Sequence, residues 1–255
     1  MLHRILWAAL VAGLVAGLAT AVLQHFTTTP LILEAELYEN GEAPGIAQSG
    51  LAPSDSGGAA FGGARLILAD ASEDHGDEGG IWAPADGLER TLSTSVVTIG
   101  TAFGFALILL SVMVLADARI SARSGLMWGI AGFAAAGLAP ALGLSPELPG
   151  SAAAVLEDRQ IWWIATAIAT AAGLWLALRI SKPWAIAGGI VLMILPHVVG
   201  APHPEGFVSE VPAELSGHFA AASLVVMAVV WSLAGTVAGY VWQRGEAKQA
   251  ATAAA

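Results

Sequence analysis

The chain has 255 residues, of which 56% are hydrophobic and only 12% are charged, and its mean hydropathy is +0.71. Soluble globular domains carry about 25% charged residues, so this composition predicts an integral membrane protein. The sequence holds no cysteine, which excludes disulfide frameworks, thiolate metal sites, iron–sulfur clusters and thiol nucleophiles. The net charge is −10, and imidazole, carboxylate and thioether groups remain as the strong metal ligands.

Six apolar runs are long enough, or nearly so, to cross a hydrocarbon core that needs about 20 helical residues. Backbone groups in lipid must bond internally, so we expect an all-α integral membrane protein with a bundle of about six transmembrane helices. None of the runs contains Asp, Glu, Lys or Arg, and the only histidine inside one is His197. The runs cover residues 5–23, 96–116, 125–144, 161–178, 184–199 and 219–241.

The first run also fits a secretory signal, because Arg4 precedes it and the small residues Ala19 and Ala21 could form a cleavage site. We favour a retained helix, since the run is longer than a usual signal core and places Gly13 and Gly17 at the spacing that permits close helix packing. Similar pairs, which we interpret as helix contacts, occur at Gly100 and Gly104 and at Gly235 and Gly239.

Residues 26–95 form the one long loop, which is acidic and predicted to be external. Within it, residues 27–39 predict a short helix at the membrane surface, capped by Thr29 with Pro30 at the first helical position. The remainder is rich in Gly, Ser, Pro and acidic residues, which is typical of a segment without a packed core. His75 among four acidic residues could gather metal ions loosely, and a flexible loop without that role fits equally well.

The basic residues predict the orientation of the bundle, because Lys and Arg concentrate on the cytoplasmic side of membrane proteins. Seven lie on the side of the two termini and three on the other, which places both termini in the cytoplasm. Eighteen of the twenty acidic residues fall on the external side, which therefore attracts cations, although a solvated acidic loop without a site fits the same count. The seven are Arg4, Arg119, Arg123, Arg179, Lys182, Arg244 and Lys248, and the three are Arg65, Arg90 and Arg159.

Motifs that would identify an enzyme or a nucleotide-driven pump do not occur in the sequence. It has no GxxxxGK[ST], no HExxH and no GxSxG, which are the patterns of phosphate-binding loops, zinc peptidases and serine hydrolases. We therefore expect neither an enzyme nor a tightly bound cofactor.

Five of the six histidines lie at or beyond the outer ends of the predicted helices. His197 lies in the last turn of the fifth run, where Pro196 removes a backbone donor and can break the helix, freeing carbonyl groups. Transporters commonly build ion sites at such broken helices, and Met193 could add a weak thioether ligand or merely pack. An interfacial histidine that binds nothing also fits this position.

The link after the fifth run, residues 199–218, has no Lys or Arg and carries several glutamates. Glu214 and His218 are four residues apart and would align if the last helix begins early. Such nitrogen and oxygen ligands suit Co²⁺, Ni²⁺ or Zn²⁺, whereas a hydrogen-bonded pair at the start of a helix is equally consistent. We predict a metal entrance made of His25, Glu34, His197, His203, Glu205, Glu214 and His218.

The two ends of the chain resemble a known family. "RILWAALVAGLVAGLATAVLQHFTTTPLILEAELYE" (residues 4–39) is similar to the N-terminal region of the CbtA family of predicted cobalt transporters. "LPHVVGAPHPE" and "VPAELSGHFAAASLVVMAVVWSLAGTVAGYVW" are similar to its C-terminal region. The resemblance implies a multi-pass protein of the bacterial inner membrane that supplies cobalt for cobalamin synthesis, often with a small single-span, histidine-bearing CbtB subunit. The family is often described with five spans, whereas six are counted here.

Our leading hypothesis is a transporter subunit that binds Co²⁺ or a similar divalent ion at the outer face and passes it through the bundle. We expect as partners the metal ion, the lipid bilayer and a CbtB-like subunit, and no nucleic acid. Two alternatives stay open: a membrane electron-transfer subunit for haem or quinone, and a metal-binding accessory protein that does not transport. Besides His197, the runs offer the ion only methionines, backbone carbonyls and hydroxyls such as those of Thr98, Thr101, Thr166 and Thr170.

Overall fold

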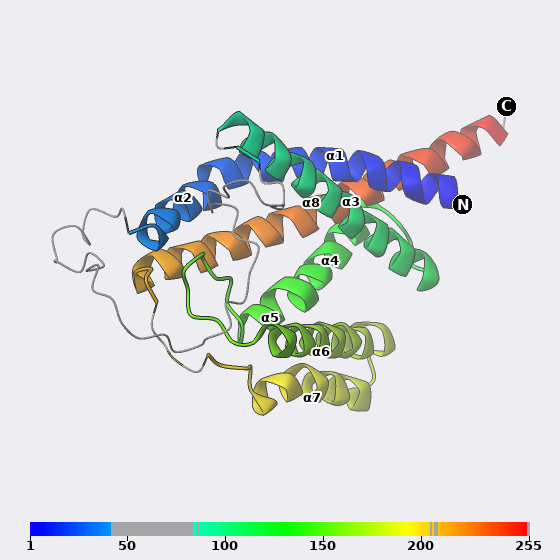
Figure 1. The fold of residues 1–255 in the computed structure, drawn as a ribbon. Helices are drawn as coiled ribbons and strands as arrows, with labels where there is room; N and C mark the ends of the chain where they lie inside the picture. Colours follow the sequence, from blue (N-terminus) through cyan, green and yellow to red (C-terminus); the bar gives the residue numbers. More distant parts are fainter. Residues whose placement is uncertain (42–83, 86, 205, 207–208, 254–255) are drawn as a thin grey trace, which may run out of the picture.

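The computed structural model describes residues 1–41, 84–85, 87–204, 206 and 209–253, and these residues are mostly helical, with no strand among them (Figure 1). The all-α class is therefore confirmed. The predicted roles of His75 and Glu205 concern positions outside the described residues. In chain order the helices are α1 (Leu2–Phe26), α2 (Thr28–Glu39), α3 (Leu88–Leu115), α4 (Ala122–Phe133), the π-helix η1 (Ala134–Leu138), α5 (Ala139–Ala141), α6 (Leu156–Trp175), the π-helix η2 (Leu176–Ile180), α7 (Pro183–Val199) and α8 (Ala213–Ala253).

Five helical segments are long and apolar enough to cross a membrane, so the chain is a multi-pass membrane protein. They are α1, α3, the continuous helix from α4 to α5, α6 with η2, and α8. The sixth apolar helix, α7, has 17 residues, or about 26 Å at 1.5 Å per residue. That length is slightly less than the roughly 30 Å of a hydrocarbon core.

Small residues let the helices of the main bundle, α1, α3, α4 and α8, approach one another closely. A Cβ atom added to Gly13 of α1 would lie 2.6 Å from the Cβ of Phe103 in α3. A Cβ atom on Gly235 of α8 would lie 2.2 Å from the backbone oxygen of Gly125 in α4. The predicted helix contacts are thus confirmed for the pair Gly13 and Gly17 and for the pair Gly235 and Gly239. The prediction was wrong for Gly100 and Gly104, which face open space in the described part of the chain.

Helices α6 and α7 form a hairpin beside this bundle (Figure 1). The turn between them places Ser181 in the left-handed conformation, with φ at +53°. Helix α7 packs mainly against α6 and η2, and the hairpin touches the bundle through α4, η1 and α5. The position of α7 therefore depends on its contact with α6.

The short helix α2 bends from the end of α1 toward the start of α8, at the end of the bundle away from the termini (Figure 1). It begins at Thr28, so the prediction that Thr29 caps it was wrong: the α1 helix runs on to Phe26 and only Thr27 separates the two helices. An ion pair between Glu36 and Arg90 ties α2 to α3. A small apolar cluster joins α2 to the loop after α5 and to the start of α8 through Ala35, Leu148, Val211 and Leu215.

Candidate functional site

The predicted ligands within the described residues gather at the end of the bundle opposite the two termini, which we call the α2 end (Figure 1). His25 lies in the last turn of α1 and His197 in the last turn of α7. His218 lies near the start of α8. Contacts across this end include a 3.4 Å hydrogen bond from the backbone nitrogen of Glu210 to the backbone oxygen of Gly150.

The opposite end, with both termini, carries most of the described cations and is here called the basic end. There Arg4 of α1 pairs with Glu246 of α8 at 3.3 Å. The backbone nitrogen of Ala122 donates to the side chain of Gln243 at 3.5 Å. The cations of this end are Arg4, Arg119, Arg123, Arg179, Lys182, Arg244 and Lys248.

Most of the predicted ligands are exposed to solvent or lipid. Of the six that are described, only His197 is half-buried. No three histidine, aspartate or glutamate side chains come together as a metal site anywhere in the described ranges. Since α8 begins at Ala213, Glu214 and His218 are both helical and lie on one face. The full set of seven ligands stays a prediction.

His197 lies against α6, in the interface that we call the α6–α7 seam. The indole nitrogen of Trp162 donates a buried hydrogen bond of 3.2 Å to the backbone oxygen of Pro196. The rings of Trp162 and His197 meet edge to face with centroids 5.7 Å apart. Helix α7 continues through Pro196 to Val199, so the predicted break at the proline was wrong. A proline leaves one backbone carbonyl of the preceding turn without its N–H donor. In a membrane protein, neighbouring groups can satisfy that carbonyl, so the helix can continue.

Two hydroxyl groups occupy the α6 side of the seam. Thr166 and Thr170 are 0% and 4% exposed, and neither hydroxyl has a hydrogen-bond partner within the described residues. They continue the stripe that begins at Trp162, since residues four apart share one helix face. A buried hydroxyl without a partner is costly, so these groups are available to bind an incoming water, ion or carbonyl.

The seam narrows where Gly173 of α6 crosses Gly189 of α7. A Cβ atom on either glycine would lie 2.5 Å from the backbone oxygen of the other. The side chain of Met193 also packs there, because its Cγ would be 2.7 Å from a Cβ on Gly173. The crossing closes the seam on the side away from His197.

Trp162 and Glu147 also lie at the α2 end, and neither was among the predicted ligands. Tryptophan is enriched where membrane helices meet water, and that tendency is the only sequence signal for Trp162. Burial raises the pKa of the Glu147 carboxyl above its ordinary value of 4.5, and the neighbouring Arg159 partly opposes this shift. The two side chains form an ion pair, which the spacing of the residues in the sequence does not reveal.

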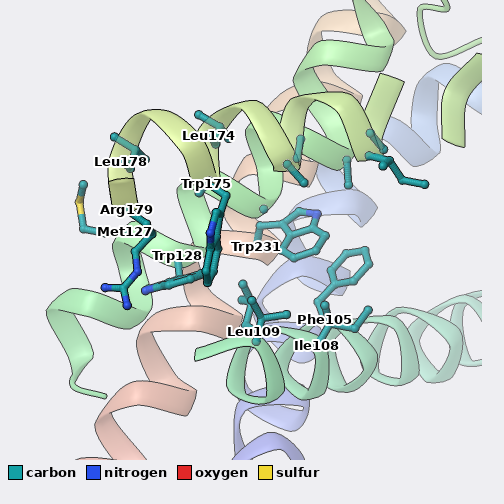
Figure 2. Close-up of a pocket in the computed structure, with 18 of the residues that line it drawn as sticks. Phe105, Ile108, Leu109, Met127, Trp128, Leu174, Trp175, Leu178, Arg179 and Trp231 are labelled. Atoms are coloured by element: carbon teal, nitrogen blue, oxygen red, sulfur yellow. The ribbon is translucent and has the colours of Figure 1, made fainter. Parts of the chain in front are cut away.

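A separate pocket of about 700 Å³ lies between α3, α4, α6 and α8 (Figure 2). Its described lining is almost wholly apolar and includes neither histidine nor carboxylate. Arg179 is the one charged side chain in that lining, and it would repel a divalent cation. The pocket therefore offers no route for a metal ion.

A family model described as "Probable cobalt transporter subunit (CbtA)" matches residues 2–243, nearly the whole chain. No curated protein and no solved structure matches the chain. The matched range includes all the predicted ligands and both helices of the seam.

Proposed function

The chain belongs to the CbtA family of probable cobalt transporter subunits, and from this premise we propose that it takes up Co²⁺ for cobalamin synthesis. In this proposal it spans the bacterial inner membrane with both termini in the cytoplasm, and the α2 end faces outward. Ni²⁺ and Zn²⁺ are the closest competitors, because they accept the same nitrogen and oxygen ligands.

The observation that carries the proposal is the separation of ligands from cations along the bundle. Four histidines and two glutamates from the predicted set lie at the α2 end, and most of the described basic residues lie at the other. An acidic surface raises the local concentration of divalent cations. Glu214 and His218, side by side on α8, provide the first carboxylate and imidazole for capture.

The α6–α7 seam is the best-supported inward step from this entrance. His197 stands at its outer end, and the unpartnered hydroxyls of Thr166 and Thr170 follow along α6. These groups can replace part of the hydration shell of the ion. The crossing of Gly173 and Gly189 closes the seam beyond them, so passage requires α6 and α7 to separate or another chain to take part.

The family description names a subunit, which supports a second chain in the transporter. We propose a small single-span, histidine-bearing partner of the CbtB type. It would complete the coordination that the described residues leave incomplete, since no three of their ligands meet.

Radiolabelled cobalt uptake tests the entrance, measured with and without the CbtB-type partner. We expect Glu214→Ala and His197→Ala each to raise the half-saturating cobalt concentration by at least about tenfold. Loss of a residue that only supports a metal ligand typically lowers metal affinity by about that factor or more, and loss of a ligand itself should cost no less. The matched control is Glu157→Ala, which removes an exposed carboxylate near the same end outside the predicted ligand set. Uptake unchanged in both test variants would refute the entrance while leaving transport itself intact.

Expression of the chain alone in a strain that lacks cobalt uptake distinguishes a transporter from an accessory protein. Restored uptake without the partner would show that the chain transports by itself. Uptake only with the partner would support the incomplete site described above. Cobalt binding without uptake under either condition would contradict the transport proposal and favour metal capture.

A further inference from the structure

The apolar pocket between the bundle and the hairpin has a feature that the metal entrance lacks. Both π-helical segments of the described chain line it, η1 through Ala135 and Ala136 and η2 through Leu178 and Arg179. Such segments are rare and occur frequently at functional sites. Their convergence on one cavity indicates a binding site rather than a packing defect.

The walls of the pocket select an apolar occupant. Four tryptophans contribute to the lining: Trp128, Trp163, Trp175 and Trp231. The ring of Trp231 stacks on that of Phe105 with centroids 4.0 Å apart. Trp128 and Trp175 meet edge to face at 6.2 Å (Figure 2). Aromatic and aliphatic walls of this kind favour a hydrocarbon chain over any polar ligand.

One end of the pocket is cationic. Arg179 lies there beside Trp175 (Figure 2), with its guanidinium 5.7 Å from that ring and one nitrogen 2.6 Å from the backbone oxygen of Ala116. It is exposed and has no carboxylate partner among the residues described. Arg123 lies one helical turn before the lining residue Met127, on the same face of α4. The open mouth therefore complements an anion.

The pocket runs along α6 and η2. Its lining on α6 runs from Trp163 to Arg179, about 24 Å at 1.5 Å per residue. An acyl chain is slender enough to lie along this wall within the cavity of about 700 Å³.

We propose that this pocket binds an anionic phospholipid of the leaflet at the basic end. An acyl chain lies between α3 and α6 against the tryptophans, and the phosphate contacts Arg179 with support from Arg123. Basic groups beside a cleft between transmembrane helices recognise lipid headgroups in this way. The bound lipid fills the gap between the bundle and the α6–α7 hairpin.

Quenching of tryptophan fluorescence by brominated acyl chains tests the proposal. The full chain is placed in phosphatidylcholine vesicles that contain increasing fractions of either brominated phosphatidylglycerol or brominated phosphatidylcholine. We expect half-maximal quenching at a lower fraction of phosphatidylglycerol than of phosphatidylcholine. Arg179→Gln should reduce this preference about fivefold, which is the contribution of one arginine to binding at an anionic membrane surface. The matched control is Arg244→Gln, because Arg244 lies at the same end but packs on Tyr240.

Equal quenching by the two lipids in the wild type, or an unchanged preference in Arg179→Gln, would overturn the proposal. Ala171→Leu provides a second variant, since the larger side chain narrows the pocket and leaves Arg179 in place. Native mass spectrometry is expected to show fewer phosphatidylglycerol molecules retained by Ala171→Leu than by the wild type. Equal retention of phosphatidylglycerol by the two proteins would also overturn the proposal. So would a bound polypeptide that is detected with the wild type and is absent from Ala171→Leu.

Discussion

The crossing of α6 and α7 allows the effect of one methyl group to be worked out from the structure. In Gly189→Ala the new Cβ atom would lie 2.5 Å from the backbone oxygen of Gly173, whereas ordinary contacts begin at 3.4 Å. The obstacle is backbone and cannot rotate away. The helices must therefore separate by about 0.9 Å, and overpacking of this kind costs about 1–3 kcal/mol.

The neighbouring position supplies the control. Gly188 lies in the same helix and meets nothing within 4 Å, so Gly188→Ala adds the same methyl group without a clash. Both substitutions gain about 1 kcal/mol of intrinsic helix propensity, which cancels when the variants are compared. The remaining difference measures the crossing alone.

Thermal unfolding of the purified protein in detergent, followed by tryptophan fluorescence, measures this difference. Gly189→Ala is expected to unfold roughly 2–12 °C below Gly188→Ala, since 1 kcal/mol shifts Tm by about 2–4 °C in a chain of this size. Its cobalt uptake should also fall, because His197 is carried on the displaced helix. Identical unfolding temperatures for the two variants would refute the close crossing and with it the narrowing of the seam.

Three further predictions concern other contacts. Gly235→Ala should lower Tm by a similar amount at the α4–α8 crossing, whereas Gly100→Ala, which faces open space, should leave it unchanged or raise it. Trp162→Phe removes the indole donor but keeps a ring, so chemical unfolding should show a loss of about 0.5–1.5 kcal/mol; a larger loss would indicate that the ring itself is displaced. Burial raises the pKa of Glu147 in the folded protein, so the contribution of this group to stability is complete below pH 4.5 and is lost as the pH rises through the raised pKa. The free energy of unfolding, measured across this pH range, should no longer show this decrease in Glu147→Gln. In Arg159→Gln the decrease should continue to higher pH, because the arginine lowers the pKa of Glu147.

Hydropathy was sufficient to predict the helical segments, because each apolar run falls largely on one helix of the structure. It could not predict which side of a helix faces protein. Gly100 and Gly104 have the same spacing as Gly235 and Gly239, yet only the second pair meets another helix. Spacing identifies a surface that permits close approach, and the neighbouring helix decides whether the approach occurs.

The order of the apolar runs is sufficient to place the candidate ligands at one end of the bundle, because each span carries the chain from one end to the other. It could not predict their distances from one another. Trp162 and Pro196 are 34 residues apart in sequence and are joined by a hydrogen bond that depends on how α6 and α7 pack. Pro196 itself suggested a break in α7, whereas the helix persists through it to Val199.

The contact between Gly173 and Gly189 lies near the middle of α7. About 12 Å of helix extends from Gly189 to His197, and about 9 Å extends the other way to Pro183, at 1.5 Å per residue. A rigid helix that tilts about this point moves its two arms in opposite directions, by amounts in the ratio of their lengths. A rigid tilt that moved the His197 end away from α6 would therefore move the Pro183 end toward it.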